Sequence, residues 1–483
     1  MKRLSIYTLL AGTMLASSCQ KDLINPVPSA QLSDVSAFDT KERIVSQVNG
    51  LYSVAKNGNF FGERYEIYND VRGEEFINQQ QNAFTAYQTW NFTVIGNSQE
   101  VQNLWNQGYI TINNINVFLD GLAASGTKVI DEATADNYIG EAKFLRGLSY
   151  YSLSQLYTRP YWDNPSTNLG LVVYTEGHKS PQAYQKARST VEETYKQVIT
   201  DLDSAETLLP DTYDDATLNV THAHKNAAIA LKTRVYLSMG AYDKVITEAN
   251  KIVPLTAPFV APSGVPNALA DKISDVFTSY TTTESIFSFP FTSASGDDPN
   301  SQNSFGEYYL PGALGGKNEY SLNPAGIIAN TTWTTTDDRR KFIYTADGTP
   351  YLTKFATPDP FTDWNPVLRY SEVLLNLAEA LAHQTNAVDP RAVALLNAVR
   401  NRSDKATTFT VASFATVTDL INAVLLERRI ELLGEGFRGA DITRLGLPFP
   451  VKGGAGAVQP TDKKYIWPIS TSELTYNKLA KDN

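Results

Sequence analysis

The stretch Asp419-Leu-Ile-Asn-Ala-Val-Leu-Leu-Glu-Arg-Arg-Ile-Glu-Leu-Leu-Gly-Glu-Gly-Phe-Arg-Gly-Ala-Asp-Ile-Thr-Arg-Leu-Gly446 combines an apolar helical pattern with a dense run of charges. Apolar residues recur here at i, i+4, i+7 and i+8, the spacing of a half-buried helix: Val417, Ile421, Val424 and Leu425. Gly434 and Gly436 come next, and glycine readily adopts the left-handed backbone that ends a helix. We therefore predict a helix that closes in a glycine turn.

The same stretch places charged residues beside this apolar face: Glu427, Arg428, Arg429, Glu431, Glu435, Arg438, Asp441 and Arg444. Charges this close to a core persist when they are paired and hydrogen-bonded, so we interpret the set as a structural ion network that fixes the turn. The alternative is that Glu427 and Glu431, one helical turn apart, form an acid/base pair. We favour the network because carboxylates at i, i+4 are common on ordinary helices.

Helical patterns dominate the rest of the chain and predict a mainly α fold. The predicted helices cover residues 99–122, 137–157, 190–209, 369–383, 390–402 and 417–433. In the clearest of them, Ser189 and Glu192 form a capping box and Pro210 ends the helix. Two further helices between residues 227 and 252 meet at a glycine turn and resemble a tetratricopeptide hairpin. We expect a tetratricopeptide-like helical scaffold over about residues 99–252 and 369–446.

Two long segments, about residues 60–98 and 253–367, lack a regular period, and we predict that they form a large irregular ligand-binding region. The first is rich in aromatic residues: Phe60, Phe61, Tyr65, Tyr68, Phe76, Phe84, Tyr87, Trp90 and Phe92. Irregular, aromatic-rich backbone is poor core material and favours a surface that presents ring faces to a ligand. The alternative is that these rings hold a long loop onto the helices. An irregular segment as long as the second one is usually functional or an inserted subdomain.

The first 35 residues are predicted to be a signal peptide followed by a tether. Lys2 and Arg3 precede an apolar run and then small residues, the pattern of a signal peptide over residues 1–18. Cys19, the only cysteine, follows at the position where a bacterial lipoprotein accepts its lipid. The alternative is an ordinary signal peptide with a chance cysteine. Residues 19–35 then form a lipidated tether, and residues 36–483 a single domain.

Composition and motifs argue against several classes of function. The formal net charge of −10, without a basic cluster, argues against nucleic acid as a partner. The sequence holds no HExxH, P-loop, G-x-S-x-G or dinucleotide-binding glycine pattern, so we expect no catalytic residue and no cofactor. His222 and His224 diverge on a helix, so we expect no metal site there. With 51 acidic residues, a pair of glycosidase carboxylates is neither identified nor excluded.

A set of motifs in a fixed order gives the chain a resemblance to a known family. Besides Cys19, they are Asn49-Gly-Leu-Tyr52, Glu141-Ala-Lys-Phe-Leu-Arg146, Arg188-Ser-Thr-Val-Glu192, Arg369-Tyr-Ser-Glu-Val-Leu-Leu-Asn-Leu-Ala-Glu-Ala380, Leu396-Asn-Ala-Val-Arg-Asn-Arg402 and, most specific, Glu427-Arg-Arg-Ile-Glu-Leu-Leu-Gly-Glu-Gly-Phe-Arg438. With these motifs the whole mature chain resembles the SusD/RagB family of outer-membrane, glycan-binding lipoproteins. The tail departs slightly at Ser470, where many members have proline.

The resemblance implies a lipid-anchored protein on the outer surface of the outer membrane. Its helical scaffold would back onto a SusC-like TonB-dependent transporter, and the irregular face opposite would capture an oligosaccharide or polysaccharide for import. Gln20-Lys-Asp22 resembles the short signal that sends such lipoproteins to the cell surface. Two alternatives stay open: a subunit that captures peptides, or a lid that closes its transporter with weak affinity of its own. A hydrolase is a third and would release fragments from its substrate.

A glycan site needs ring faces and polar side chains and no cofactor. Sugar rings pack their C–H faces on aromatic rings, while polar groups bind their hydroxyls. For the stacking rings we predict Trp90, Trp333 and Tyr308. For the hydroxyl contacts we predict Asp70, Arg72 and Asn91.

Overall fold

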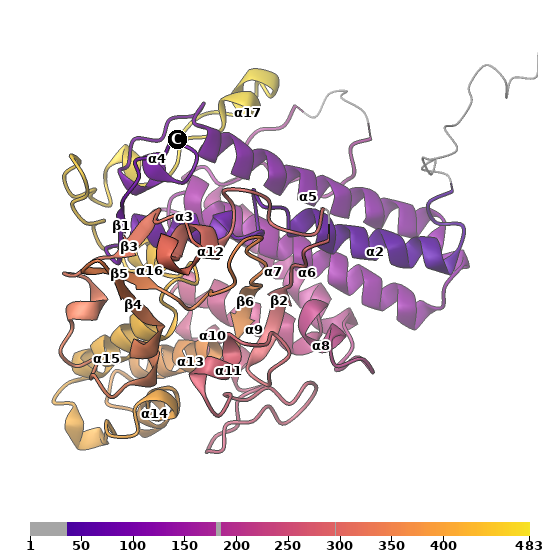
Figure 1. Cartoon of the computed structure of the whole chain (residues 1–483). Coiled ribbons are helices and arrows are strands. Elements are labelled where there is room, and N and C mark those ends of the chain that lie inside the picture. The colour runs from indigo at the N-terminus through magenta and orange to yellow at the C-terminus, as the bar shows by residue number, and fades with distance from the viewer. Residues whose placement is uncertain (1–35, 180–184, 295) are drawn as a thin grey trace, which may run out of the picture.

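The computed structural model describes residues 36–179, 185–294 and 296–483 of the chain (Figure 1). The predicted signal peptide, Cys19 and the tether up to residue 35 lie outside the described residues. No helix in the described part is long and apolar enough to cross a membrane. The structure therefore tests the prediction of the domain and not the prediction of the signal peptide and tether.

The scaffold is a succession of helices, each packed on its neighbours in chain order. Its main members are α2 (Lys41–Ala55), α5 (Gln99–Ala124), α6 (Glu132–Tyr157), α7 (Val191–Leu208), α9 (Lys225–Ser238), α10 (Tyr242–Ala249), α13 (Tyr370–Thr385), α14 (Pro390–Ser403) and α15 (Val417–Glu431). α5 packs on α2 and α6, α7 on α6 and α9, and α13 on α10, α14 and α15. In Figure 1 the long helices α2, α5 and α6 extend to the right, and α14 and α15 lie at the lower left. The predicted mainly α fold is confirmed.

Helix ends follow the local sequence closely. At the start of α7 the Thr190 hydroxyl accepts from the N–H of Glu193, and the Glu193 carboxylate accepts from the N–H of Thr190, at 3.1 and 2.8 Å. The predicted capping pair of Ser189 and Glu192 is one residue too early, because Thr190 is the residue with the extended backbone of an N-cap. Such boxes satisfy N–H groups that a helix leaves without a partner.

Short elements interrupt the segments between the long helices. The strands are β1 (Phe76–Asn78), β2 (Ser285–Phe289), β3 (Tyr320–Leu322), β4 (Ile343–Ala346), β5 (Thr349–Leu352) and β6 (Asn365–Arg369). They form antiparallel pairs β1–β3, β2–β6 and β4–β5, and β1–β3 ties the first predicted irregular segment to the second. The short helices are α3 (Arg64–Arg72), α4 (Tyr87–Trp90), α8 (Leu218–Thr221), α11 (Ile273–Val276), α12 (Phe305–Tyr309), α16 (Arg438–Arg444) and α17 (Thr471–Tyr476).

The segment 60–98 is more ordered and more buried than predicted. α3 lies within it, and all nine residues of that helix are buried. Phe60, Phe61 and Tyr68 join the main hydrophobic cluster, whose members run from Phe38 to Ile469. For these rings the alternative interpretation is correct: they hold the segment onto the helices and present no face to solvent.

A buried ion network joins α15 to distant parts of the chain. Its cations are Arg339, Lys354, Arg369, Arg400 and Arg402, and its anions are Glu284, Asp337, Glu427, Glu431 and Glu435. At its centre, Arg369 lies 2.9 Å from Glu431 and 2.7 Å from Glu435. Each of the ten side chains is 4% exposed or less, and the cations balance the anions in number. Complete pairing of this kind is what makes buried charge tolerable.

The remaining charges between Glu427 and Arg444 are paired as well. Arg428 and Arg444 both contact Asp441, at 3.2 and 2.7 Å, while Arg429 and Arg438 contact the acidic residues that precede β1. Gly434 and Gly436 have φ of 81° and 84°, as predicted for the turn. The predicted structural ion network is thus confirmed.

The alternative of an acid/base pair does not fit the geometry. Glu427 and Glu431 are fully buried, and both contact Arg339, at 2.6 and 3.0 Å. Burial by itself would raise the pKa of Glu431, but Arg402, Arg369 and Arg339 together hold it well below its usual range. A carboxylate locked in its ionised form among arginines cannot exchange protons with a substrate near neutral pH.

Replacing Arg369 with methionine is expected to destabilise the fold by about 3–5 kcal/mol, because Glu284, Glu431 and Glu435 would lose a shared buried cation. Urea unfolding followed by circular dichroism measures this loss. The matched control is Arg43→Met, which breaks an exposed pair with Asp39 at 3.6 Å and should cost less than about 1 kcal/mol. Equal losses in the two variants would contradict a central role for the network.

Candidate functional site

The three rings predicted to stack on a sugar are buried. Trp90, only 8% exposed, donates its Nε1–H to the carbonyl of Phe76 at 2.9 Å. Tyr308 is fully buried and stacks on Tyr320, with ring centroids 5.8 Å apart. Trp333 is buried beneath the guanidinium of Arg340, 4.1 Å from the ring centroid. In this structure each ring packs inside the protein, and the predicted set of stacking platforms has no open ring face.

Two of the three predicted hydroxyl contacts are buried too. Asp70 accepts a hydrogen bond from the N–H of Gly436 at 2.8 Å, and Arg72 donates to the carbonyl of Tyr465 at 2.5 Å. Burial raises the pKa of Asp70 to about 7 and lowers that of Arg72 to about 10. Asn91 is partly exposed, and its Oδ1 accepts from the hydroxyl of Thr93 at 2.5 Å.

The structure brings only some of these six residues together. The loop around Lys452 links Arg72 and Trp90: Lys452 donates to the carbonyl of Val71, and its Nζ lies 5.8 Å from the Trp90 ring. Trp333 belongs to a different region, where the neighbouring Thr334 donates to Asp404 of the α14 end at 2.9 Å. The predicted residues therefore do not form one site.

Phe84 is the exposed ring that sequence reasoning missed. It is 53% exposed and is the one residue of the aromatic-rich set with a largely open side chain. It ends a loop that carries the four amides Gln79, Gln80, Gln81 and Asn82 and then Ala83. That polar run on the N-terminal side was the available signal, because it offers the ring little apolar surface to pack on.

The loop that carries Phe84 is held firmly. Gln79 Nε2 donates to Ser321 Oγ at 2.7 Å, and Asn82 Nδ2 donates to Glu319 Oε1 at 3.2 Å. The guanidinium of Arg64 donates to the carbonyl of Phe84 at 3.0 Å. The ring thus stands on a positioned backbone, as a ligand platform requires.

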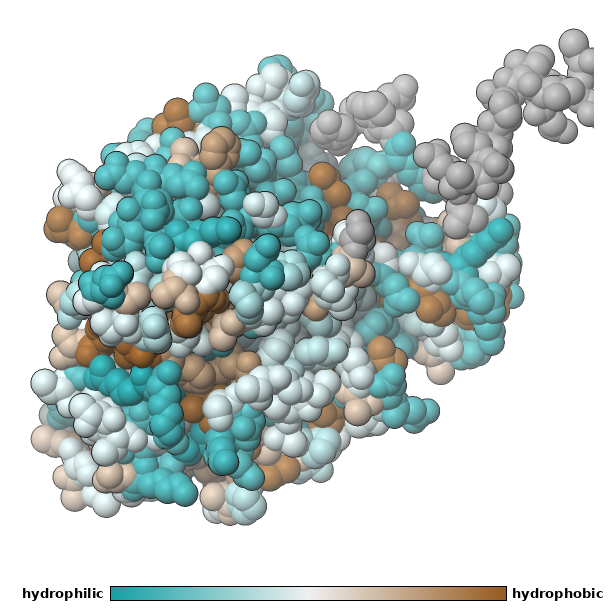
Figure 2. Space-filling view, viewed as in Figure 1, coloured by the Kyte–Doolittle hydropathy of each residue, from teal (hydrophilic) through white to brown (hydrophobic). Residues whose placement is uncertain are grey.

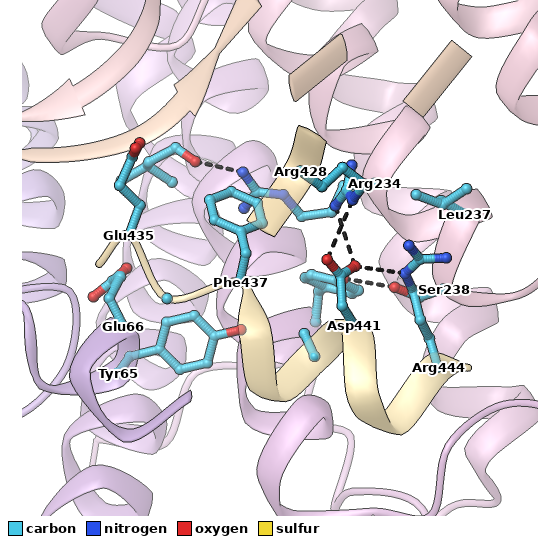
Figure 3. A pocket seen from close by; sticks show the side chains of 14 residues that line it. Tyr65, Glu66, Arg234, Leu237, Ser238, Arg428, Glu435, Phe437, Asp441 and Arg444 are labelled. Carbon is cyan, nitrogen blue, oxygen red and sulfur yellow. Dashed lines mark hydrogen bonds and ion pairs between the residues drawn. The ribbon is translucent and has the colours of Figure 1, made fainter. Parts of the chain in front are cut away.

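A polar hollow lies beneath the glycine turn, and Figure 3 shows the side chains that line it. Tyr65 and Glu66 form one wall, and Asp441 lies between Arg428 and Arg444 on the other. Its volume is about 30 Å³, which accommodates one or two water molecules and no sugar ring. The hollow is therefore a packing feature of the core and not a glycan site.

Glu66 is the unusual group in this hollow. Its Oε2 is buried without a hydrogen-bond partner in the described part of the chain, and burial raises its pKa to about 8.

No group of three or more His, Cys, Asp or Glu among the described residues is arranged to hold a metal. His222 and His224 turn to separate partners, Glu141 and the carbonyl of Ile286.

Glu66→Gln is expected to reduce the loss of stability that occurs as the pH rises toward about 8. An acid whose folded pKa is about 8 binds its proton more tightly in the fold than in the unfolded chain. Glu66 should therefore cost the wild type on the order of 1.4 kcal/mol for each pH unit between its ordinary pKa and about 8, and the variant should lack this contribution. Urea unfolding at pH 5, 7 and 9 measures the difference.

The control for this variant is Glu42→Gln. Glu42 is exposed, and hydrogen bonds from its own backbone N–H and from Thr40 place its pKa below the ordinary value. The ionised form of Glu42 stabilises the fold at pH values above its ordinary pKa, and this contribution is lost only in acid. The free energy of unfolding of Glu42→Gln should therefore change with pH from 5 to 9 as that of the wild type does. A wild type whose stability is flat over that range would contradict the burial of an acidic Glu66.

Comparison with known proteins agrees with this architecture. Residues 26–237 match a family profile described as "Starch-binding associating with outer membrane", and residues 330–449 match the "SusD family" profile. A SusD superfamily protein from Bacteroides fragilis is 32% identical, with a TM-score of 0.82 over 92% of this chain and 99% of that one.

Two further relatives are more distant. SusD-like protein P2 of Formosa agariphila is 25% identical over all of this chain and 99% of its own length. A structure titled "Laminarin binding SusD-like protein" has a TM-score of 0.71 at 20% identity, over 92% of this chain and 99% of that one, and shares the fold. From the ion-paired helical scaffold, the two profile matches and the 32% identity to a solved member, the chain belongs to the SusD/RagB family of carbohydrate-binding, outer-membrane-associated proteins.

Proposed function

We propose that this protein is a cell-surface lipoprotein that captures a glycan and delivers it to a SusC-like, TonB-dependent outer-membrane transporter. The observation that carries the proposal is the match to the SusD family over almost the whole chain. A neighbour with the same fold is a laminarin-binding SusD-like protein, which supports a glycan as the ligand. The leader-like residues 1–18 and the following Cys19 support anchoring to the outer membrane.

We place the capture face at the loop of residues 79–84. An exposed ring with neighbouring amides offers what a sugar needs, a flat apolar surface and groups that bind hydroxyls. Figure 2 shows one face of the molecule, on which hydrophilic and intermediate residues predominate and smaller hydrophobic areas lie between them. Such a site has low intrinsic affinity, because one ring covers one sugar unit.

The six residues predicted from sequence take different roles in this proposal. Asn91 is kept as a hydroxyl contact, since it is partly exposed. The buried residues Trp90, Tyr308, Asp70 and Arg72 are proposed to support the surface from beneath, whereas Trp333 lies in a different region and takes no part in this face. We propose no catalytic role for any of them, because the family is a binding family.

Native gels cast with a panel of neutral polysaccharides, laminarin among them, test the proposal on the chain begun at Gln20. We expect retardation in at least one gel, without release of reducing sugar. If none of the polysaccharides retards the protein, glycan capture is overturned, and the result favours peptide cargo or a lid that acts only with its transporter.

Phe84→Ala is expected to weaken binding in the retarding gel about tenfold, because a sugar would lose a stacking contact of the size of ~1.4 kcal/mol. The control is Tyr344→Ala, which removes an exposed ring from β4. Wild-type retardation of Phe84→Ala would move the capture face elsewhere.

A further inference from the structure

A cleft of about 600 Å³ opens along one face of α5, and none of residues 79–84 lines it. Its volume lies within the range of about 300–1,000 Å³ that small-molecule sites occupy. None of the six residues predicted for the glycan site lines it. The cleft is therefore a separate candidate site that the family match does not explain.

One wall of the cleft is aromatic and apolar. Tyr109 of α5 and Tyr174 of the segment after α6 both line it, with ring centroids 6.2 Å apart and planes at 82°. Ile110, 48% exposed, adds an apolar surface next to Tyr109. These groups give a ligand an apolar corner rather than a flat patch.

The aromatic wall is built before any ligand arrives. The Tyr109 hydroxyl donates to the carbonyl of Val172 and accepts from its N–H, both at 3.0 Å. The Trp105 ring packs against Tyr109 from within the core, with centroids 4.7 Å apart. Asn113 fixes the position of the segment after α6. Its Nδ2 donates to the carbonyl of His178 at 3.0 Å, and its Oδ1 accepts from the N–H of His178 at 2.8 Å. Preorganised walls of this kind lower the entropic cost of binding.

Polar groups border the same space. Asn106 and Asn114 are exposed on α5, and Glu473 of α17 closes one end. Asn106 Oδ1 accepts from Ser472 at 3.0 Å, which orients the amide and leaves its NH₂ as a donor for a ligand. Glu473 accepts from Asn477 at 2.6 Å and faces Trp105 Nε1 at 3.4 Å.

The combination matches the chemistry of a neutral sugar. A pyranose has apolar C–H faces for Tyr109 and Ile110 and hydroxyls for the amides of Asn106 and Asn114. The walls carry both signs of charge, Glu473 and Lys179, so neither a polyanion nor a polycation is favoured. We propose that the α5 cleft is a second glycan-binding site, which takes a short neutral oligosaccharide; the inference rests on the proposed glycan-binding function.

Isothermal titration with neutral hexasaccharides tests this inference. The panel contains β-1,3-glucan, β-1,4-glucan, α-1,4-glucan, β-1,4-xylan and β-1,4-mannan hexamers. For the wild-type chain begun at Gln20 we expect that at least one of the hexamers binds at two sites on the protein. Ile110→Ser should remove one of them or weaken it at least tenfold, since it deletes the exposed apolar contact. Asn114→Trp, which fills the cleft, should do the same.

The matched control is Val45→Ser, which removes an exposed β-branched residue, 40% accessible, from the neighbouring helix α2. All three positions are exposed on helices, and melting curves verify that the variants fold. The control should bind as the wild type does.

The outcomes separate the two proposals. Loss of a site in Ile110→Ser and Asn114→Trp, with Val45→Ser unchanged, supports the cleft. Wild-type binding by both cleft variants, with weaker binding by Phe84→Ala, overturns the cleft and leaves glycan capture standing. Binding of no hexamer by the wild type overturns the cleft together with glycan capture by the isolated chain.

Discussion

The structure depends on the mutual pairing of the charges that are buried around Arg369. The ion network around Arg369 draws together chain segments that no disulfide can join, because the chain has a single cysteine. Glu284, Arg339 and Lys354 anchor the long segment between α10 and α13 at three points. Since an unpaired charge in this core costs several kcal/mol, each segment is held in place by the others.

The same constraint reaches the proposed capture face through the glycine turn. A Cβ at Gly436 would lie 2.6 Å from the Cα of Glu66, so the turn sits directly on α3. Asp70 accepts from the turn, and Arg64, at the other end of α3, holds the carbonyl of Phe84. The helix α3, which is buried along its whole length, thus links the network to the loop.

Sequence reasoning succeeded where structure is local. The period of apolar residues predicted helices over 99–122 and 417–433, and the structure has Gln99–Ala124 and Val417–Glu431. The charges after Glu427 indicated an ion network because no other arrangement tolerates them beside a core. The site was harder. Trp90 and Phe84 lie six residues apart in one segment, and only the structure shows that Trp90 is covered and Phe84 open.

By itself the sequence determined the helical class, the paired charges and the family, because periodicity, charge and motif order are properties of neighbouring residues. The tertiary structure decided which rings face solvent and where a cleft opens. Trp333 is covered by Arg340, and Tyr109 meets Tyr174 from a segment more than sixty residues away along the chain. Exposure depends on partners that are remote in sequence, and the pattern around a single ring does not contain them.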